Sequence, residues 1–425
     1  MAMADNYFPV PLKRIVVDTV PNFDLFIKQK ERYVLYRKAN YTFTKENLRN
    51  LIDNRIEDLF VQKRDLKLYE QYRLQVREET EEEFKAKGFE GIFCDPEEVN
   101  RYHAILGNYH SVDNRLFVEG AEIDFPVYAH VENDVALFPE IESKKEGPWE
   151  LTPSICSFKK EIMIRKTDMP KYRAFVEKMM ASPSGADQPA LMRKATALRE
   201  MSKIVVQDVL DDPRSGEKMK KVGDSVNNMV DFILENETSY FSLMTISAHD
   251  FYTYTHSLNV CTFSLGLGSA IGLPKTPDLE MLGLGTMLHD IGKSQVDSKL
   301  INKPGRLTDE EFMAMKNHVT LGVNLLKEHH NLPAQVMEPV AQHHEKLTGS
   351  GYPNGIKGDQ LTLFGRISSI VDIYDALTTV RSYKKAFTPF EALSILAKNE
   401  DDYDHQLLRE VVLMLGRQVK SAGKA

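Results

Sequence analysis

The spacing of apolar and polar positions divides the chain into two parts of different character. Up to about residue 180, short runs rich in β-branched and aromatic residues alternate with helix-like stretches, which predicts an α/β (α+β) domain. From about residue 190 to 415 the apolar positions recur with helical spacing, so the second half is predicted to be all-α. The individual predictions in the first part are strands at 14–17, 33–36 and 59–61 and a helix at 45–53.

The α/β part contains a segment that recurs. Residues 61–69, 94–102 and 164–172 each leave an apolar run, pass an acidic or proline turn, and enter a helix that carries tyrosine at the ninth position. The tripeptide Phe-Pro-Val at 8–10 and 125–127 is a second echo. Internal duplication of an α/β module is one hypothesis for these echoes, and chance recurrence of short motifs is the other.

The predicted domain boundary lies in a run of small residues, glycine and proline at 181–189, which indicates a linker or a helix start. Two helical stretches follow at 190–210 and 218–234, and proline at position 213 is expected to end the first of them. We therefore expect a multidomain chain, with an N-terminal regulatory or interaction domain over 1–180, linker helices over 181–240 and an all-α domain over 241–425.

Composition excludes several classes of protein. The chain has 54 basic and 62 acidic residues, a formal net charge of −8, which argues against a protein that binds polymeric nucleic acid over its whole surface. Its three cysteines are far apart and form no CxxC pair, so neither a disulfide framework nor a cysteine zinc site is expected. No signal-peptide pattern opens the sequence, and the longest uncharged stretch, 257–274, is shorter than the ~20 apolar residues of a spanning helix. These features predict a soluble, cytoplasmic protein with no membrane span.

Histidines concentrate in the all-α half, where eight of the twelve lie between residues 249 and 344. The densest segment, 288–293 (Leu-His-Asp-Ile-Gly-Lys), predicts a helix with His289 and Lys293 one turn apart and Asp290 about 100° around from them. A buried ion pair in a core helix is the alternative. Further imidazoles and a carboxylate that suit first-row divalent ions occur at His256, His318, His343, His344 and Asp372.

A lone histidine on an apolar helix face is more often a core residue than a ligand. Five histidines and two aspartates in one all-α domain are harder to explain in that way, and with one bridging carboxylate they could hold two metal ions. The whole spacing resembles the HD-GYP family of bacterial cyclic di-GMP phosphodiesterases over about residues 240–410. The motifs are His256-Ser257, His289-Asp290-x-x-Lys293, His318-x-x-x-Gly322, His343-His344-Glu345-x-x-x-Gly349-x-Gly351-Tyr352-Pro353 and Asp372-x-x-Asp375-Ala-Leu-x-x-x-Arg381.

The resemblance implies an all-α HD-GYP helical bundle that holds two divalent metal ions per chain, with iron or manganese expected. It assigns His256, His289, Asp290 and Asp372 to one ion, and Asp290, His318, His343 and His344 to the other, so that Asp290 bridges. A water or hydroxide between the ions would be the nucleophile. The family pattern makes Lys293 and Asp290 catalytic, and its substrate-binding positions are Gly351, Tyr352, Pro353, Arg381 and Lys384.

The sequence departs from the family pattern at three positions. Some members carry a glutamate for a third metal where this chain has Tyr252, so two metals are predicted, with a compensating ligand from the neighbouring residues 249–250 left open. Val319 replaces a common proline and Thr348 a common aspartate. Four further residues in or near the motifs are not expected to be ligands: the adjacent pair at 329–330 as a surface feature, Asp375 as a support for a ligand, and Cys261 as a core residue.

The function implied by the resemblance is hydrolysis of cyclic di-GMP to pGpG, with a further step to GMP left open. One alternative is a catalytically weak receptor that binds the dinucleotide and acts through protein contacts. Another is a preference for a related cyclic dinucleotide such as cyclic GMP-AMP. The family architecture also implies a homodimer through the linker helices and a signalling partner for the N-terminal domain, whose own ligand the sequence does not identify.

Overall fold

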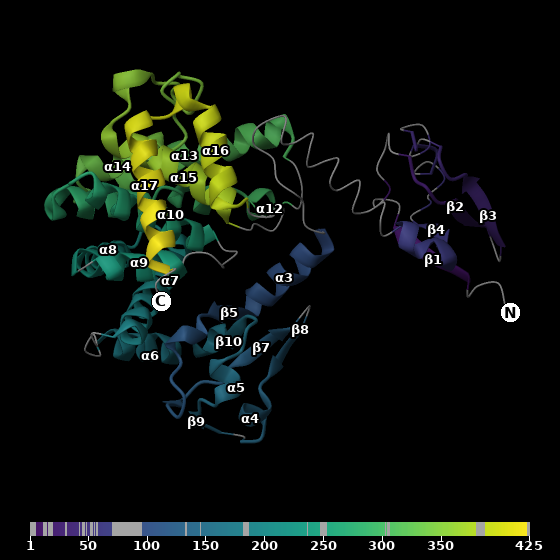
Figure 1. Ribbon diagram of the computed structural model, residues 1–425, viewed down its shortest axis with the longest axis horizontal. Coiled ribbons are helices and arrows are strands. Elements are labelled where there is room, and N and C mark those ends of the chain that lie inside the picture. The colour runs from purple at the N-terminus through teal and green to yellow at the C-terminus, as the bar shows by residue number, and fades with distance from the viewer. Residues whose placement is uncertain are drawn as a thin grey trace. The chain divides into compact units, whose positions relative to one another are not determined.

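The structure is a computed structural model of the 425-residue chain (Figure 1). It divides into two compact units, residues 1–92 and 93–425, and each is described by itself. The structure describes all residues except 1–5, 12–14, 16–19, 30–31, 42, 45–46, 48, 52–53, 55, 57, 70–95, 132–133, 145, 182–186, 236, 247–252, 302, 304–306, 380–386 and 423–425.

The first unit is built on an antiparallel sheet of four strands in the order β1-β4-β2-β3. Val10, Leu25, Leu59 and Val61 point from these strands into a small core and are fully buried. The predicted strands at 33–36 and 59–61 are confirmed; residues 47 and 49–51 of the predicted helix are helical, and most of 14–17 lies outside the described residues. The strands are β1 (Tyr7–Pro11), β2 (Leu25–Gln29), β3 (Arg32–Arg37) and β4 (Asp58–Gln62).

The second unit begins with another antiparallel sheet, in the order β5-β10-β7-β8, and a pair of two-residue strands, β6 and β9. The strands are β5 (Tyr109–Val112), β6 (Glu122–Ile123), β7 (Tyr128–Val131), β8 (Asp134–Leu137), β9 (Trp149–Glu150) and β10 (Ile162–Arg165). The helices among them are α3 (Pro96–Asn108), α4 (Pro139–Glu142), α5 (Pro153–Cys156) and α6 (Met169–Ala181).

The two four-stranded sheets share one topology, because in each the first strand pairs with the last and the middle two form a hairpin. In each, the last strand runs through a 3-10 turn, Lys63–Asp65 or Lys166–Asp168, into a helix. Tyr69 and Tyr172 follow these turns, and both are buried. The Phe-Pro-Val echo does not fit the same correspondence, since one copy lies in β1 and the other precedes β7. Duplication stays a prediction, and the shared topology favours it.

The second half of the chain is helical, as predicted. The first two helices agree with the predicted stretches, and the break between them falls at Asp212-Pro213 because proline cannot continue a helix. No described helix is long and apolar enough to cross a membrane. The helices are α7 (Gln188–Asp211), α8 (Gly216–Glu235), α9 (Glu237–Ile246), α10 (Thr253–Ala270), α11 (Glu280–Met287), α12 (Ser298–Ile301), α13 (Asp309–Lys327), α14 (Met337–Gln342), α15 (Leu363–Thr378), α16 (Pro389–Lys398) and α17 (His405–Ala422).

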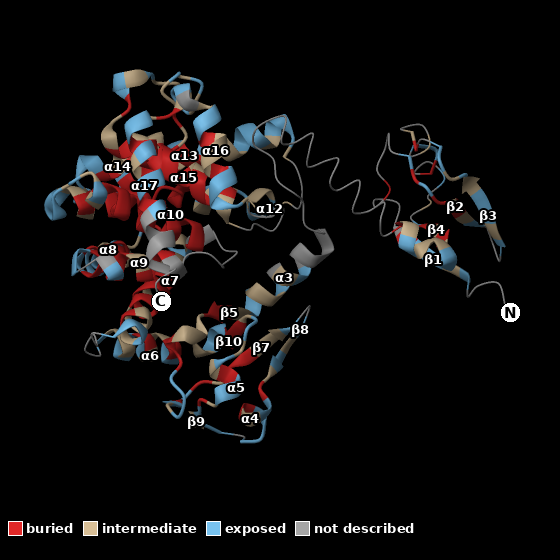
Figure 2. Cartoon of the chain, in the orientation of Figure 1, coloured by how far each residue is buried: buried red, intermediate tan, exposed pale blue. Residues whose placement is uncertain are grey.

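Helix α7 is buried between the second sheet and the helical bundle, as Figures 1 and 2 show. Ala197 and Ile204 pack into the core that the sheet shares with α6, whereas Leu198 and Val205 pack into the core of the bundle. Helix α7, which was predicted as a linker, therefore contributes side chains to two hydrophobic cores. The predicted division at residue 180 stays a prediction; by its contacts the chain divides instead between residues 92 and 93.

Candidate metal centre

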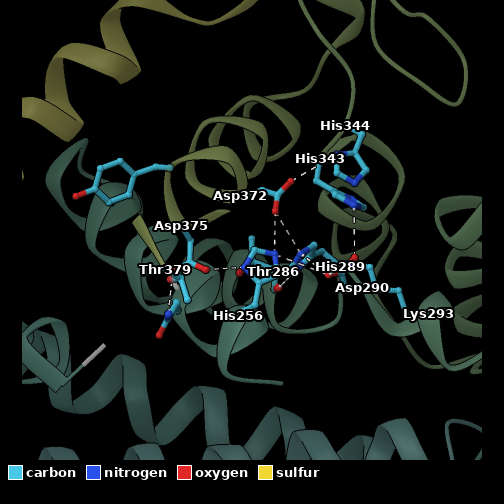
Figure 3. A network of polar contacts seen from close by, with 12 residues as sticks. His256, Thr286, His289, Asp290, Lys293, His343, His344, Asp372, Asp375 and Thr379 are labelled. Carbon is cyan, nitrogen blue, oxygen red and sulfur yellow. Dashed lines mark hydrogen bonds and ion pairs between the residues drawn. The ribbon is translucent and has the colours of Figure 1, made fainter. Parts of the chain in front are cut away.

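The predicted metal ligands come from five separate parts of the helical bundle and meet at one place. Figure 3 labels all of them except His318. All are buried except His344, whose side chain is 24% exposed. The contributions are His256 from α10, His289 and Asp290 from the turn after α11, His318 from α13, His343 and His344 from the end of α14, and Asp372 from α15.

The His289-Asp290 pair does not lie on a continuous helix, so the predicted helical spacing was wrong. Helix α11 ends at Met287, residues 288–290 form a turn, and a 3-10 helix runs from Ile291 to Gln295. The reason is a close approach to α13: a Cβ atom at Gly292 would lie 1.9 Å from the backbone oxygen of His318. Only glycine permits this contact. Lys293 still reaches Asp290, with Nζ 2.5 Å from Oδ2.

Asp290 lies between two pairs of histidines, and each of its carboxylate oxygens faces one pair. Oδ1 is 3.3 Å from Nε2 of His318 and 3.9 Å from Nε2 of His343. Oδ2 is 3.4 Å from Nε2 of His289 and 3.8 Å from Nε2 of His256. A carboxylate with this placement can contribute one oxygen to each of two cations.

Asp372 is the second carboxylate that faces these histidines. Its Oδ1 lies 2.9 Å from Nε2 of His256, and its Oδ2 lies 3.5 Å from Nδ1 of His344. Three sets of three side chains thus have potential ligand atoms within 4.8 Å of one another: His256, His289 and Asp372; His318, His343 and His344; and His289, Asp290 and His343. The first two sets contain, apart from Asp290, the ligands that the family resemblance assigns to two ions, and the third places Asp290 between them.

Four of the histidines are held in orientation through their second ring nitrogen. A backbone carbonyl can only accept, so an Nδ1 bonded to one carries the hydrogen and leaves the Nε2 lone pair directed at the centre. The Nδ1 partners are the carbonyl of Thr286 for His289 (2.7 Å), that of Met315 for His318 (2.8 Å), that of Pro339 for His343 (3.0 Å) and the carboxylate of Asp375 for His256 (2.6 Å).

The centre contains electron-pair donors that have no hydrogen to accept. Nε2 of His289 and Oδ1 of Asp290 are buried without a hydrogen-bond partner among the described residues. Nε2 of His318 lies 3.2 Å from Nε2 of His343, although both rings carry their hydrogen on Nδ1. Buried polar atoms without partners are costly, and a cation removes that cost here. The residues present therefore fit divalent metal ions.

The electrostatics of the cluster favour the protonation states that bind metals. Burial raises the pKa of Asp290, but the Lys293 ammonium and the neighbouring imidazoles outweigh it and hold the pKa well below its usual range. Burial lowers the pKa of His318, and it lowers the pKa of His343 well below its ordinary value with help from the neighbouring imidazoles. Near neutral pH the carboxylate is therefore ionised and these two imidazoles are neutral.

The predicted Gly-x-Gly-Tyr-Pro loop lies against the exposed edge of the centre. The ring of Tyr352 lies over that of His344, with centroids 4.6 Å apart, and the Tyr352 N–H donates to the backbone oxygen of His344. A Cβ atom at Gly351 would lie 2.5 Å from that same oxygen, so this close return requires glycine. Pro353, the next residue, is exposed.

Three residues for which the sequence predicted no role contact this loop: Glu345, which belongs to a quoted motif, and Asp402 and Lys316, which lie outside the motifs. Buried Glu345 accepts from the N–H groups of residues 354 and 355, and Asp402 accepts from the hydroxyl of Thr348 at 2.6 Å. The family aspartate at position 348 would repel Asp402, which explains why threonine fits. Lys316 on α13 places its Nζ 4.9 Å from the ring centroid of Tyr352.

The remaining predictions have mixed outcomes. Arg381 and Lys384 lie outside the described residues, as do residues 249, 250 and 252, so the predicted phosphate contacts and the two-metal prediction at Tyr252 stay predictions. His329 donates from Nε2 to the backbone oxygen of Pro213 and is not part of the cluster. Cys261 is a buried core residue, as expected.

Comparison with known families matches residues 245–407 to the HD domain. Residues 245–407 are an HD domain. This segment contains every predicted metal ligand, and the resemblance inferred from the motifs is confirmed at this level. The helical bundle is thus a known framework for metal-binding histidines and aspartates.

The relatives of this chain include enzymes named for two substrates. A cyclic di-GMP phosphodiesterase of Pseudomonas aeruginosa is 34% identical over 243 residues, which are 56% of this chain and 58% of the relative. A 3'3'-cGAMP-specific phosphodiesterase of Vibrio cholerae is 34% identical over 167 residues, which are 39% of this chain and 32% of the relative. The chain therefore matches less than two thirds of the length of either protein.

A solved structure supports the fold. A Bdellovibrio bacteriovorus protein named as an HDG"Y"P protein superimposes with a TM-score of 0.56, over 72% of this chain and 99% of that chain. The two sequences are 19% identical, so the likeness concerns the architecture only.

Proposed function

We propose that this protein is a metal-dependent phosphodiesterase that hydrolyses cyclic di-GMP to pGpG. The observation that carries the proposal is Asp290, whose two oxygens face two pairs of imidazoles, and whose Oδ1 is buried without a hydrogen-bond partner among the described residues, as is Nε2 of His289. This donor set lies in an HD domain, and its longest match among the relatives quoted above is to a cyclic di-GMP phosphodiesterase.

The chain supplies ligands for two ions. His256, His289, Asp290 and Asp372 would hold one, and Asp290, His318, His343 and His344 would hold the other. Bound ions would make water nucleophilic near neutral pH and would stabilise negative charge on the phosphodiester. Imidazole and carboxylate ligands suit first-row divalent ions without selecting among them, and iron or manganese is the proposed occupant.

Two cationic side chains can meet the anionic substrate. Lys293 contacts the buried Asp290, but its own side chain is 19% exposed. Its ammonium can therefore also donate to a phosphate oxygen. Lys316 stands beside Tyr352 at the edge of the centre. Tyr352 itself offers an aromatic ring next to His344, where it can position a base or ribose. Local charge of this kind permits an acidic protein to bind a dianion.

A second candidate substrate is 3'3'-cGAMP. It is favoured by the match to the Vibrio cholerae enzyme named for that substrate. Both cyclic dinucleotides present two phosphodiesters on a similar ring, so the metal centre alone does not discriminate between them. The residues that contact the bases determine the substrate preference, and kcat/KM values for the two substrates measure that preference.

The decisive experiment combines metal analysis of anaerobically purified protein with turnover of cyclic di-GMP and 3'3'-cGAMP. We expect about two ions per chain and conversion of cyclic di-GMP to pGpG. The Asp290→Ala variant is expected to lose both the bound metal and the activity. His329→Ala is the matched control, because it removes a histidine of the same domain outside the cluster. Full metal occupancy without turnover of either substrate, under iron and manganese loading, would contradict the hydrolase and favour a receptor.

The predicted assembly remains part of this proposal. A regulatory N-terminal domain, a signalling partner and a homodimer through the linker helices are consistent with the fold. Helix α7 is, however, largely buried within its own chain, so α8 offers more exposed surface for a second copy.

A further inference from the structure

A chain of buried hydrogen bonds leads from helix α7 to one predicted metal ligand. Arg199 donates from Nη2 to Oδ1 of Asn259 at 2.7 Å, and Asn259 donates from Nδ2 to Oδ1 of Asp375 at 2.8 Å. Asp375 contacts Nδ1 of His256 through Oδ2 at 2.6 Å (Figure 3). Nε2 of His256 faces the centre, 2.9 Å from Asp372.

The first three members of this chain are almost completely removed from water. Arg199 is 2% exposed, Asn259 0% and Asp375 1%. A side-chain amide between a guanidinium and a carboxylate has one favourable orientation, with its oxygen toward the cation and its NH₂ toward the anion. Arg199 therefore holds Asn259 in the orientation that lets it donate to Asp375. Thr379 supplies a second donor to the same oxygen of Asp375, at 2.9 Å.

The carboxylate of Asp375 in turn sets the ring of His256. Groups that hold the second nitrogen of a metal-bound histidine fix its tautomer and direction, and they raise its strength as a ligand. We propose that Arg199 is a positioning residue for the metal ligand His256, acting through Asn259 and Asp375. This inference rests on the proposed metal centre and extends it to a helix outside the HD domain.

Helix α7 is well suited to this task, because the residues next to Arg199 attach it to the sheet of the second unit. Glu200 accepts from the hydroxyl of Tyr172 on α6 at 2.6 Å and pairs with Lys203 at 2.8 Å. Lys203 also donates to the backbone oxygen of Ser111 in β5 at 3.3 Å. Arg199 thus projects toward His256 from a helix whose rotation is set by the α/β part of the chain.

The test is the affinity of the full chain for Mn²⁺, measured by titration of folded, metal-free protein near neutral pH. Arg199→Met is expected to weaken binding about tenfold, since the loss of an outer support for a metal-bound histidine typically has that size. Arg199→Gln keeps a donor for Asn259 and should recover most of the loss. Thr196→Val is the control, because Thr196 is buried on the same helix and bonds to its own backbone at Met192. Its Mn²⁺ affinity should equal that of the wild type.

A second variant covers the case in which Arg199→Met does not fold. Asn259→Asp preserves shape and gains an ion pair with Arg199, yet it loses the N–H that Asp375 accepts, so the same affinity loss is expected. Combining Arg199→Met with Asp375→Asn should weaken binding no further than Asp375→Asn alone, because both act on one path.

Wild-type Mn²⁺ affinity in the folded Arg199→Met or Asn259→Asp protein would overturn the inference, as would losses that multiply in the double variant. Because the readout needs no substrate, it separates the two proposals. A wild type that binds Mn²⁺ but turns over no cyclic dinucleotide contradicts only the proposed activity. A wild type that binds no divalent ion contradicts both.

Discussion

Arg199 connects two clusters of buried polar side chains whose chemistry differs. One is the charged cluster of Glu200 and Lys203 next to it on α7, and the other is the candidate metal centre, which it reaches through hydrogen bonds. On α7, the groups of the charged cluster formed by Glu200 and Lys203 have opposite polarity: the ammonium donates to the carboxylate, and Tyr172 donates to the same carboxylate. In the metal centre the converging atoms are alike, because the imidazole nitrogens and the oxygens of Asp290 all offer electron pairs.

This difference separates a structural cluster from a binding site. Opposite charges in a dry interior satisfy each other and need nothing else, although their desolvation makes them weak evidence for added stability. Electron-pair donors that face one another are unfavourable until a cation enters. Burial of polar groups is common to both regions, so the polarity of the facing atoms is the property that distinguishes them.

The largest expected effect is that of Asp290→Ala, which removes the carboxylate between the two pairs of histidines. We expect loss of bound metal and a fall in turnover of ~10³-fold or more, about 4 kcal/mol of transition-state stabilisation. Metal content and phosphodiesterase rate measure it. Retention of two ions per chain by this variant would show that Asp290 does not bridge.

Breaking the charged cluster on α7 should act on stability rather than on metal binding. Lys203→Met leaves the carboxylate of Glu200 buried without its cation, and we expect the free energy of unfolding to fall by about 3 kcal/mol. Adding Glu200→Gln should restore much of this, because the amide can still accept from Tyr172. Urea unfolding measures both variants, and an equal or larger loss in the double variant would contradict the pairing.

A smaller effect is expected from Asp402, where opposite polarities meet nearer the surface. Burial raises the pKa of Asp402, but hydrogen bonds from Lys346 and Thr348 outweigh it and lower the pKa below its ordinary value. A lowered pKa in the folded state means stability that is present above the unfolded pKa and lost as pH falls through the folded one. Asp402→Asn should cost about 1 kcal/mol at pH 7 and less in acid.

The measurement for Asp402→Asn is urea unfolding between pH 7 and acid pH. Metal-free protein is used, so that loss of ions in acid does not change the free energy of unfolding. The gap between wild type and variant should narrow below pH ~4, where an unfolded aspartate becomes protonated. A gap that is constant with pH would show that the ionised form of Asp402 makes no special contribution.

The smallest expected effect is that of His329→Ala. His329 belongs to a histidine pair in the sequence, but its Nε2 contacts the backbone oxygen of Pro213 and no second electron-pair donor faces it in the described structure. We expect unchanged metal content and a change in unfolding free energy within about 0.5 kcal/mol. A reduced metal content would show that pairs of adjacent histidines matter irrespective of what faces them.

The sequence by itself identified the helical half, and it singled out the seven predicted ligands that the structure brings together, because those residues belong to motifs of fixed local spacing. It also placed the break after α7, since proline acts on the turn in which it stands. It failed for the helix over 289–293, because the winding there depends on the contact of Gly292 with α13, a helix that begins seventeen residues after Gly292.

Only the tertiary structure decided which polar atoms face each other. Asn259 and Asp375 are 116 residues apart, and Arg199 and Asn259 are 60 apart, so no local pattern relates them. The same holds for Thr348 and Asp402. The sequence specifies which groups are available and the secondary structure that carries them, whereas their pairing depends on how helices pack over long separations. The proposed cation site at Asp290 and the proposed support of His256 by the predicted linker helix both depend on that pairing.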